Sequence, residues 1–276
     1  MTEPRSWLFV PADSEKKIGK ALDSAADAII FDLEDSVAPD GKVRAREVMK
    51  GLGSRSGGPQ WWVRINPLRT DDHRLDLELL GTPDIYGIVL PKAESGADIA
   101  ELAHRTGNIP VHAIVTETAA SLFGLLSYRD PKSSLAAMSW GAEDLSAALG
   151  ASSKSDESGE LSFTYKLARS LCLAGAVAAG VQPVDGVFAD FRDEAGLTAE
   201  ARAAAREGFT GKLAIHPAQV DPINAAFTPG PDEIAHARAI VDAFDAQPGA
   251  GVLAVGGKMV DRPHLLQARR VLERVR

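Results

Sequence analysis

Two acidic side chains that follow short apolar runs have the clearest potential for chemistry. Glu117 comes just after the run at residues 111–115, and Asp144 comes just after the run at residues 135–140. If these runs are neighbouring parallel strands, both carboxylates lie at one rim, where they could hold a hard cation such as Mg²⁺ together with water and a chelating substrate. A carboxylate at a strand end can also serve as a helix N-cap, so spacing alone leaves both interpretations open.

Arg64 lies near the end of a third apolar run, at residues 61–65. Its planar guanidinium matches a carboxylate through two parallel hydrogen bonds, so it could bind the carboxylate of a substrate. It could also be a structural partner of Glu34 or Asp35, which in turn could orient Arg64 or hold metal-bound water. Asp32 lies two residues before Glu34 on the same strand face, and we expect it to make hydrogen bonds in the core. We therefore place Glu34 and Asp35, with Arg64, among the catalytic candidates, ahead of Asp32.

Two further strand ends carry polar groups. Lys92 follows a proline and is either a buried ion-pair partner or a group that neutralises substrate, and both interpretations stay open. His216 and Pro217 follow another run; we interpret His216 as a turn former whose ring bonds the backbone, and we count Pro217 with Lys92 and Arg64 as substrate-binding positions. The other histidines show no spacing typical of zinc ligands, so we expect no zinc site.

The elements that must position these residues alternate between strand and helix. The apolar runs of strand length are residues 7–10, 28–31, 61–65, 87–90, 111–115, 135–140, 184–188 and 212–215. The helical patterns are residues 14–25, 43–52, 97–105, 119–128, 165–179, 198–207 and 220–226. Strands that are apolar on both faces and alternate with helices predict an α/β fold, a (β/α)8 TIM barrel, with an open doubly wound sheet as the alternative.

The chain changes character after residue 227. Residues 228–231 read Thr-Pro-Gly-Pro and predict a hinge, which is followed by a helix at residues 232–246, a glycine-rich bend at residues 248–257 and a basic final helix. We therefore predict a catalytic barrel domain at residues 1–228 and a small C-terminal helical cap at residues 229–276.

Composition disfavours several classes of protein. A net charge of −8 over 276 residues argues against nucleic acid as a partner, because phosphate binding needs clustered Lys and Arg. No apolar stretch approaches the ~20 residues of a membrane helix, so we expect no membrane association. The lone Cys172 fits a reducing compartment, and the first residues resemble neither a signal nor a transit peptide, so we expect a cytoplasmic protein.

Taken in order, the motifs resemble the HpcH/HpaI aldolase/citrate lyase family, in particular its branch similar to the citrate lyase beta subunit and to malyl-CoA and citramalyl-CoA lyases. The resemblance runs nearly from end to end. The matching stretches are RSWLFVP at residues 5–11, FDLEDSVAP at 31–39, VRIN at 63–66, LPKAE at 90–94, GAEDL at 141–145, IHP at 215–217 and KMVDRPH at 258–264. Each stretch alone is a weak signal, but their order along the chain is specific.

The resemblance implies a (β/α)8 barrel in which Glu117 and Asp144 bind one Mg²⁺ and Arg64 binds the carboxylate of a keto acid. It also implies that Asp261 acts from the C-terminal cap, as the acid in cleavage and the base in condensation. The implied substrates are 3-hydroxyacyl-CoA thioesters such as malyl-, citramalyl- or citryl-CoA, which are cleaved into, or formed from, a keto acid and an acyl-CoA. Similarity to malyl-CoA lyases further implies a homo-oligomer, a trimer or hexamer, in which Asp261 serves a neighbouring subunit.

Other activities remain open from the sequence. The chain could be an aldolase on free hydroxy-keto acids, which needs no thioester site, or a citrate lyase subunit that acts on a carrier-protein thioester. Hydrolysis of the thioester could also follow cleavage or condensation. A barrel that only binds acyl-CoA is disfavoured, because a binder has no reason to keep a metal site beside Arg64. The chain departs from many relatives at Ala12, where they have Gly, so thioester phosphate contacts near the N-terminus are not carried over from them.

Overall fold

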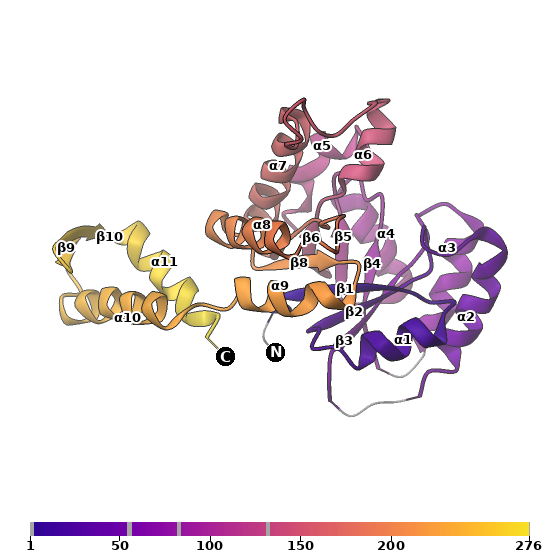
Figure 1. Ribbon diagram of the computed structural model, residues 1–276, viewed down its shortest axis with the longest axis horizontal. Coiled ribbons are helices and arrows are strands. Elements are labelled where there is room, and N and C mark those ends of the chain that lie inside the picture. Colours follow the sequence, from indigo (N-terminus) through magenta and orange to yellow (C-terminus); the bar gives the residue numbers. More distant parts are fainter. Residues whose placement is uncertain (1–2, 54–56, 82–83, 131–132, 276) are drawn as a thin grey trace. The chain divides into compact units, whose positions relative to one another are not determined.

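The chain forms two compact units, residues 3–224 and residues 225–275 (Figure 1). The computed structural model describes residues 3–53, 57–81, 84–130 and 133–275. The predicted limits of the barrel domain and of the cap include residues 1–2 and 276, which lie outside this described part.

The first unit is a closed barrel of eight parallel strands that pair in sequence order. The strands are β1 (Ser6–Pro11), β2 (Ala28–Asp32), β3 (Gln60–Arg64), β4 (Ile85–Leu90), β5 (Val111–Ile114), β6 (Leu135–Ser139), β7 (Gln182–Asp185) and β8 (Gly211–Ala214). All five residues of β2 are buried, because one face of each strand lines the barrel interior and the other packs on helices. The predicted TIM barrel is confirmed, and the open-sheet alternative is wrong because β1 pairs with β8.

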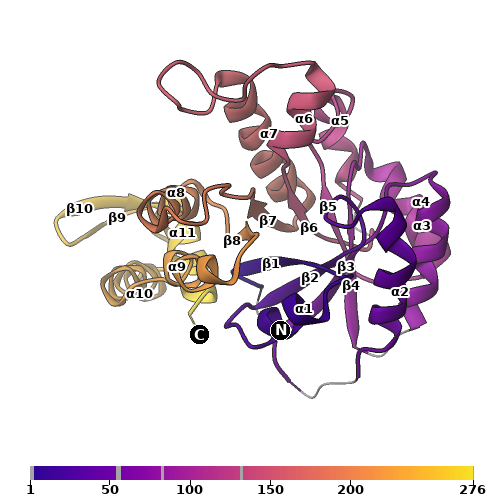
Figure 2. The same cartoon turned by 45° about the vertical axis from the view of Figure 1, so that its right-hand side comes forward.

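Helices surround the strands on the outside of the barrel (Figure 2). They are α1 (Glu15–Leu22), α2 (Lys42–Lys50), α3 (Asp71–Asp76), α4 (Gly96–Thr106), α5 (Ser121–Gly124), α6 (Ala142–Leu149), α7 (Phe163–Ala179), α8 (Glu194–Glu207) and α9 (Val220–Ala226). The sequence did not predict α3 or α6, which are short helices of six and eight residues; Leu145 is the one buried residue of α6. In the described part of the chain, no helix is both long and apolar enough to cross a membrane.

A buried histidine lies in the apolar interior of the barrel. The ring of His112, on β5, meets the ring of Trp7 nearly edge to face, with 4.5 Å between the centroids. His112 is fully buried, and neither ring nitrogen has a hydrogen-bond partner among the described residues. Burial lowers the pKa of His112 to about 3, so the folded protein keeps this ring neutral at ordinary pH.

We expect His112 to make the protein less stable in mild acid. The unfolded chain takes up a proton on this ring below pH ~6.5, whereas the folded chain does so only near pH 3. The free energy of unfolding is therefore undiminished above pH ~6.5 and falls as the pH decreases, by about 2 kcal/mol at pH ~5. Denaturant unfolding at both pH values should show this loss in the parent, and His112→Leu should escape it.

The exposed His104 offers a matched control for this experiment. A His104→Gln variant should lose as much stability as the parent between the two pH values, because its side chain stays in water in both states. If His112→Leu also loses as much as the parent, the buried imidazole is not the cause of the acid sensitivity.

The second unit contains a β-hairpin between two helices. Its elements are α10 (Pro231–Ala246), β9 (Val252–Val255), β10 (Lys258–Asp261) and α11 (Arg262–Glu273). Gly256 and Gly257 form the turn with φ of 57° and 76°, a left-handed pair that suits a two-residue hairpin. The predicted bend at residues 248–257 is therefore corrected: it contains a strand, and the Gly-Gly pair was the signal for the hairpin.

Candidate active site

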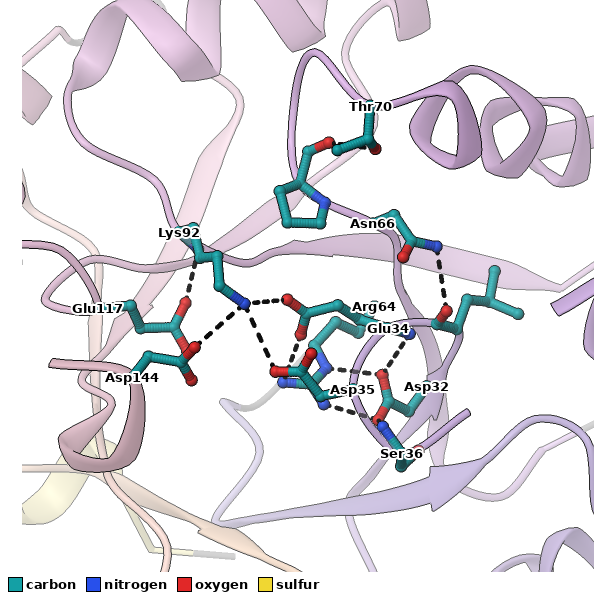
Figure 3. A network of polar contacts seen from close by, with 12 residues as sticks. Asp32, Glu34, Asp35, Ser36, Arg64, Asn66, Thr70, Lys92, Glu117 and Asp144 are labelled. Carbon is teal, nitrogen blue, oxygen red and sulfur yellow. Dashed lines mark hydrogen bonds and ion pairs between the residues drawn. The ribbon is translucent and has the colours of Figure 1, made fainter. Parts of the chain in front are cut away.

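Acidic and basic side chains gather where β2, β3, β4 and β5 end and where α6 begins (Figure 3). Arg64 is the last residue of β3, Lys92 follows β4, and Glu117 follows β5. Glu34 lies in the loop after β2, and Asp144 lies in the first turn of α6. The carboxyl ends of parallel strands meet at one rim of a barrel, which is why residues 110 positions apart come together here.

Glu117 is a buried carboxyl with one backbone partner. Its Oε2 accepts a hydrogen bond of 2.6 Å from the Lys92 N–H. Burial raises the pKa of Glu117 to about 8, and the nearby Asp144 carboxylate adds to the effect. The side chain packs on Gly141, where a Cβ would lie 2.8 Å from Glu117 Cγ. A bound cation would favour the ionised form of the Glu117 carboxyl. Gly141 leaves room for the Glu117 side chain.

Lys92 lies between the acidic groups. Its Nζ is 2.5 Å from Glu34 Oε1, 3.1 Å from Asp144 Oδ1 and 3.5 Å from Asp35 Oδ2. The residue has a φ of 51°, a left-handed conformation that costs a lysine roughly 1 kcal/mol and aims its N–H at Glu117. Lys92 is therefore an ion-pair partner at the rim, and its contact with substrate stays a prediction.

Arg64 is held by Asp32 rather than by Asp35. Its Nε and Nη2 donate to the two oxygens of Asp32 at 2.7 and 2.6 Å, and Nη1 lies 2.9 Å from Glu34 Oε2. The guanidinium also stacks over the Phe9 ring, 4.7 Å from its centroid. Although burial opposes ionisation, Arg64 holds the pKa of Asp32 below its ordinary value. The sequence missed this partner, although β2 and β3 place Asp32 directly opposite Arg64.

A second layer supports the loop that carries Glu34. Lys42 Nζ donates to the Leu33 carbonyl at 3.0 Å and to Asn66 Oδ1 at 2.5 Å. Asp76, which is fully buried, accepts hydrogen bonds from the N–H and the side-chain amide of Asn66. Sequence reasoning missed this layer, because its members are distributed over three segments that only the fold brings together.

A cavity of about 1120 Å³ opens beside these groups. Arg64, Glu117 and Asp144 line it, and so do Lys17 and Lys20 of α1. Its apolar lining includes Leu8, Phe9, Ile114, Trp140 and Leu213. The site therefore joins a charged rim to a volume large enough for an extended substrate.

His216 and Pro217 line the same cavity. His216 Nδ1 accepts a hydrogen bond from the N–H of Ala218, and the side chain of Gln219 accepts one from the N–H of His216. His216 is thus the turn former that its sequence context predicted. Contact of Pro217 with substrate stays a prediction.

Asp261 caps the final helix of the second unit. The Asp261 side chain accepts from the backbone of residue 264, and His264 Nδ1 lies 2.5 Å from Asp261 Oδ1. The hydrogen bond from His264 lowers the pKa of Asp261, so this partly exposed group is a carboxylate at neutral pH. Its predicted catalytic role is compatible with capping and stays a prediction.

A family model described as HpcH/HpaI aldolase/citrate lyase matches residues 5–217. The chain belongs to this family. Within the HpcH/HpaI family, it is 37% identical to a (3S)-malyl-CoA thioesterase of Cereibacter sphaeroides, over 97% of this chain and 93% of the relative. It is 34% identical to the mitochondrial citramalyl-CoA lyase of Mus musculus, over 97% of this chain and 85% of the relative.

A solved structure is also similar along its whole length. The CitE protein of Mycobacterium tuberculosis, in complex with magnesium, acetoacetate and coenzyme A, has a TM-score of 0.84 and 37% identity, covering 98% of this chain and 97% of that one. The predicted family and the predicted lyase class of this HpcH/HpaI protein are confirmed.

Proposed function

We propose that the protein is a Mg²⁺-dependent carbon–carbon lyase that cleaves or forms a 3-hydroxyacyl-CoA thioester such as malyl-, citramalyl- or citryl-CoA. The products of cleavage are a keto acid and an acyl-CoA. The observation that carries the proposal is the pair Glu117 and Asp144, set beside Arg64 at a cavity that Lys17 and Lys20 also line. Similarity to a protein solved with magnesium, acetoacetate and coenzyme A supports the same ligands.

Glu117 and Asp144 would hold the Mg²⁺. Two carboxylates are a usual protein contribution to such a site, which keeps several positions for water and substrate. When bound, the ion supplies Lewis-acid stabilisation of negative charge on the substrate oxygens. Lys92 keeps Glu117 in place through its N–H, and Gly141 provides the space in which the Glu117 side chain lies.

Arg64 would bind the keto-acid carboxylate through those N–H groups of its guanidinium that do not point at Asp32 or Glu34. Its two carboxylate partners hold the guanidinium plane fixed before substrate arrives, so little entropy is lost on binding. Glu34 also pairs with Lys92, and Asp35 lies at the exposed end of the same set. Glu34 and Asp35 thus orient the two cations of the site.

Asp261 would carry the proton at the α-carbon of the thioester. In cleavage, the substrate hydroxyl loses its proton to solvent and its oxygen becomes the keto oxygen; the carbon–carbon bond breaks, its electron pair passes to the thioester enolate, and an acid must protonate that carbon. In condensation, the same group removes the proton. The His264 contact lowers the pKa of Asp261, which favours the carboxylate that condensation needs. We also propose that residues 229–276 form a cap, that the protein assembles as a trimer or hexamer, and that it is located in the cytoplasm.

The cavity favours a CoA thioester over a free acid as the substrate. Lys17 and Lys20 place two cations along its lining, where they could meet the phosphates of a nucleotide tail. A free hydroxy-keto acid would fill only the part near Glu117. Ala12 is fully buried and does not line the cavity, so its replacement of the glycine common in relatives leaves these lysines available.

A substrate panel tests the proposal. Malyl-, citramalyl-, citryl- and methylmalyl-CoA are incubated with the protein and Mg²⁺, and keto acid and free thiol are measured separately. Release of keto acid without free CoA thiol identifies a lyase. Release of free CoA thiol as well identifies thioester hydrolysis, which is measured because one relative is a (3S)-malyl-CoA thioesterase. Turnover of free hydroxy-keto acids, or of a carrier-protein thioester alone, would overturn the CoA assignment.

Arg64→Lys should impair handling of the keto acid although it keeps the positive charge. An ammonium cannot form the planar fork that now meets Asp32 and would meet a substrate carboxylate. We expect kcat/KM to fall by roughly 10²-fold, equivalent to about 2.7 kcal/mol at ~1.36 kcal/mol per decade. Steady-state kinetics on the best thioester of the panel measure this decrease in kcat/KM. Kinetics like those of the parent would mean that Arg64 has only a structural role.

A further inference from the structure

Trp140 lines the same cavity as Glu117, and the proposed reaction gives it no role. It follows β6 directly and is 7% exposed. Gly141, on which Glu117 packs, is the next residue, and α6 with Asp144 begins one residue later. Both proposed metal ligands therefore depend on the position of one short segment, residues 140–144.

A buried acid holds the indole of Trp140. The indole Nε1 donates to Asp185 Oδ1 at 2.8 Å. Arg169 donates to the same oxygen at 2.8 Å, and Lys212 Nζ lies 3.0 Å from Oδ2. Although burial opposes ionisation, Lys212 and Arg169 lower the pKa of Asp185 to about 2. Asp185 is thus a permanent acceptor for the indole at ordinary pH.

Gly186 fits against the edge of the same ring. A Cβ at this position would lie 2.9 Å from both Nε1 and Cε2 of Trp140. The Gly186 carbonyl accepts a hydrogen bond of 2.7 Å from Lys212, the buried lysine that also pairs with Asp185. The Asp185 carboxylate therefore holds the indole through its N–H, and the Gly186 backbone restricts the same edge of the ring, while another part of the residue lines the cavity.

We infer that Asp185 and Gly186 are positioning residues for the metal pair, which act by fixing Trp140 and, through it, the segment that carries Asp144 and supports Glu117. This inference rests on the proposed function, because it needs Mg²⁺ at those two carboxylates. Residues behind a ligand commonly alter metal affinity by about 10- to 100-fold when they are changed.

Mg²⁺ binding to the purified protein, measured by calorimetry without substrate, tests the inference. Two variants disturb the indole from different sides: Gly186→Ala presses a Cβ on its edge, and Trp140→Phe removes the N–H donor but keeps an aromatic ring. We expect each to weaken Mg²⁺ binding by about 10-fold or more, with the circular dichroism of the parent. A merely structural role would lower the thermal midpoint and leave the affinity unchanged.

Glu200→Gln is the matched control. Glu200 Oε1 lies 2.7 Å from Lys212 Nζ, so this change alters the same ion network at its partly exposed end, away from the indole. Its Mg²⁺ affinity should equal that of the parent. Asp185→Asn is not suitable, because it would remove the buried charge with which both Lys212 and Arg169 pair and so disturb the whole ion network.

An Asp144→Asn variant separates the two ways in which the inference can fail. If Asp144→Asn binds Mg²⁺ as the parent does, the metal site and the proposed function are wrong, and the inference is wrong with them. If Asp144→Asn loses binding while Gly186→Ala and Trp140→Phe bind like the parent, only the inference is wrong. Should one of these two variants not fold, the other decides, since each acts on a different side of the contact.

Discussion

Glu117→Gln and Asp144→Asn are expected to abolish turnover while the barrel stays folded. Each replaces a proposed Mg²⁺ ligand by a neutral group of the same shape, and the amide oxygen at position 117 can still accept the hydrogen bond from Lys92. Without that charge a divalent cation is poorly held, so kcat should fall by at least about 10³-fold, equivalent to about 4 kcal/mol at ~1.36 kcal/mol per decade. Turnover over a range of Mg²⁺ concentrations measures the loss.

The fold should tolerate the change at position 117, so that a loss of activity in this variant does not reflect unfolding. Burial raises the pKa of Glu117 to about 8, which means that the ionised carboxylate is costly there without a cation. In metal-free buffer, Glu117→Gln should therefore melt no lower than the parent. Glu101→Gln, the same change at an exposed acid of α4, is the control and should keep full turnover. Parent-like turnover of either site variant at limiting Mg²⁺ would contradict the metal assignment.

Mixing two inactive variants should restore activity if Asp261 serves a neighbouring subunit. Asp261→Asn chains keep an intact barrel site, and Glu117→Gln chains keep an intact cap. In a ring in which each barrel is completed by the next subunit, random mixing of equal amounts leaves about a quarter of the sites with both parts intact. Refolding the two chains together and measuring turnover against each chain alone tests this expectation.

Two controls give the mixing experiment its meaning. A chain that carries both substitutions, mixed with either single variant, should give no recovery. Each such mixture contains either no intact barrel site or no intact cap. Native mass spectrometry shows whether mixed oligomers form. If they form and remain inactive, Asp261 either acts within its own chain or has no role beyond capping the final helix.

The sequence alone favoured a barrel over an open sheet and predicted which residues lie at its rim. Apolar runs of four to six residues report buried strands because both of their faces are covered, and β2, buried at all five positions, is an example. The residue that follows each run lies at the carboxyl end of a strand, so Glu117, Lys92 and Arg64 could be placed at one rim without coordinates. The order of short motifs then indicated the family that the comparisons confirm.

Local pattern did not reveal α6 or the hairpin of β9 and β10, for different reasons. The α6 helix is eight residues long and buries one residue, Leu145. The hairpin strands are four residues each, and their burial alternates only weakly, so the turn glycines were the stronger signal. Short elements that bury little apolar surface leave little periodicity in the sequence.

Only the tertiary structure decided which side chains meet. Arg64 pairs with Asp32 because the register of β2 and β3 sets them opposite each other, and Trp140 meets Asp185 because β6 and β7 are neighbours in the barrel. A partner chosen by strand register and by the direction of a side chain leaves no trace in local spacing. The sequence by itself therefore determined the elements and the chemistry at their ends, while the closure of the barrel determined the pairs of charges that hold that chemistry in place.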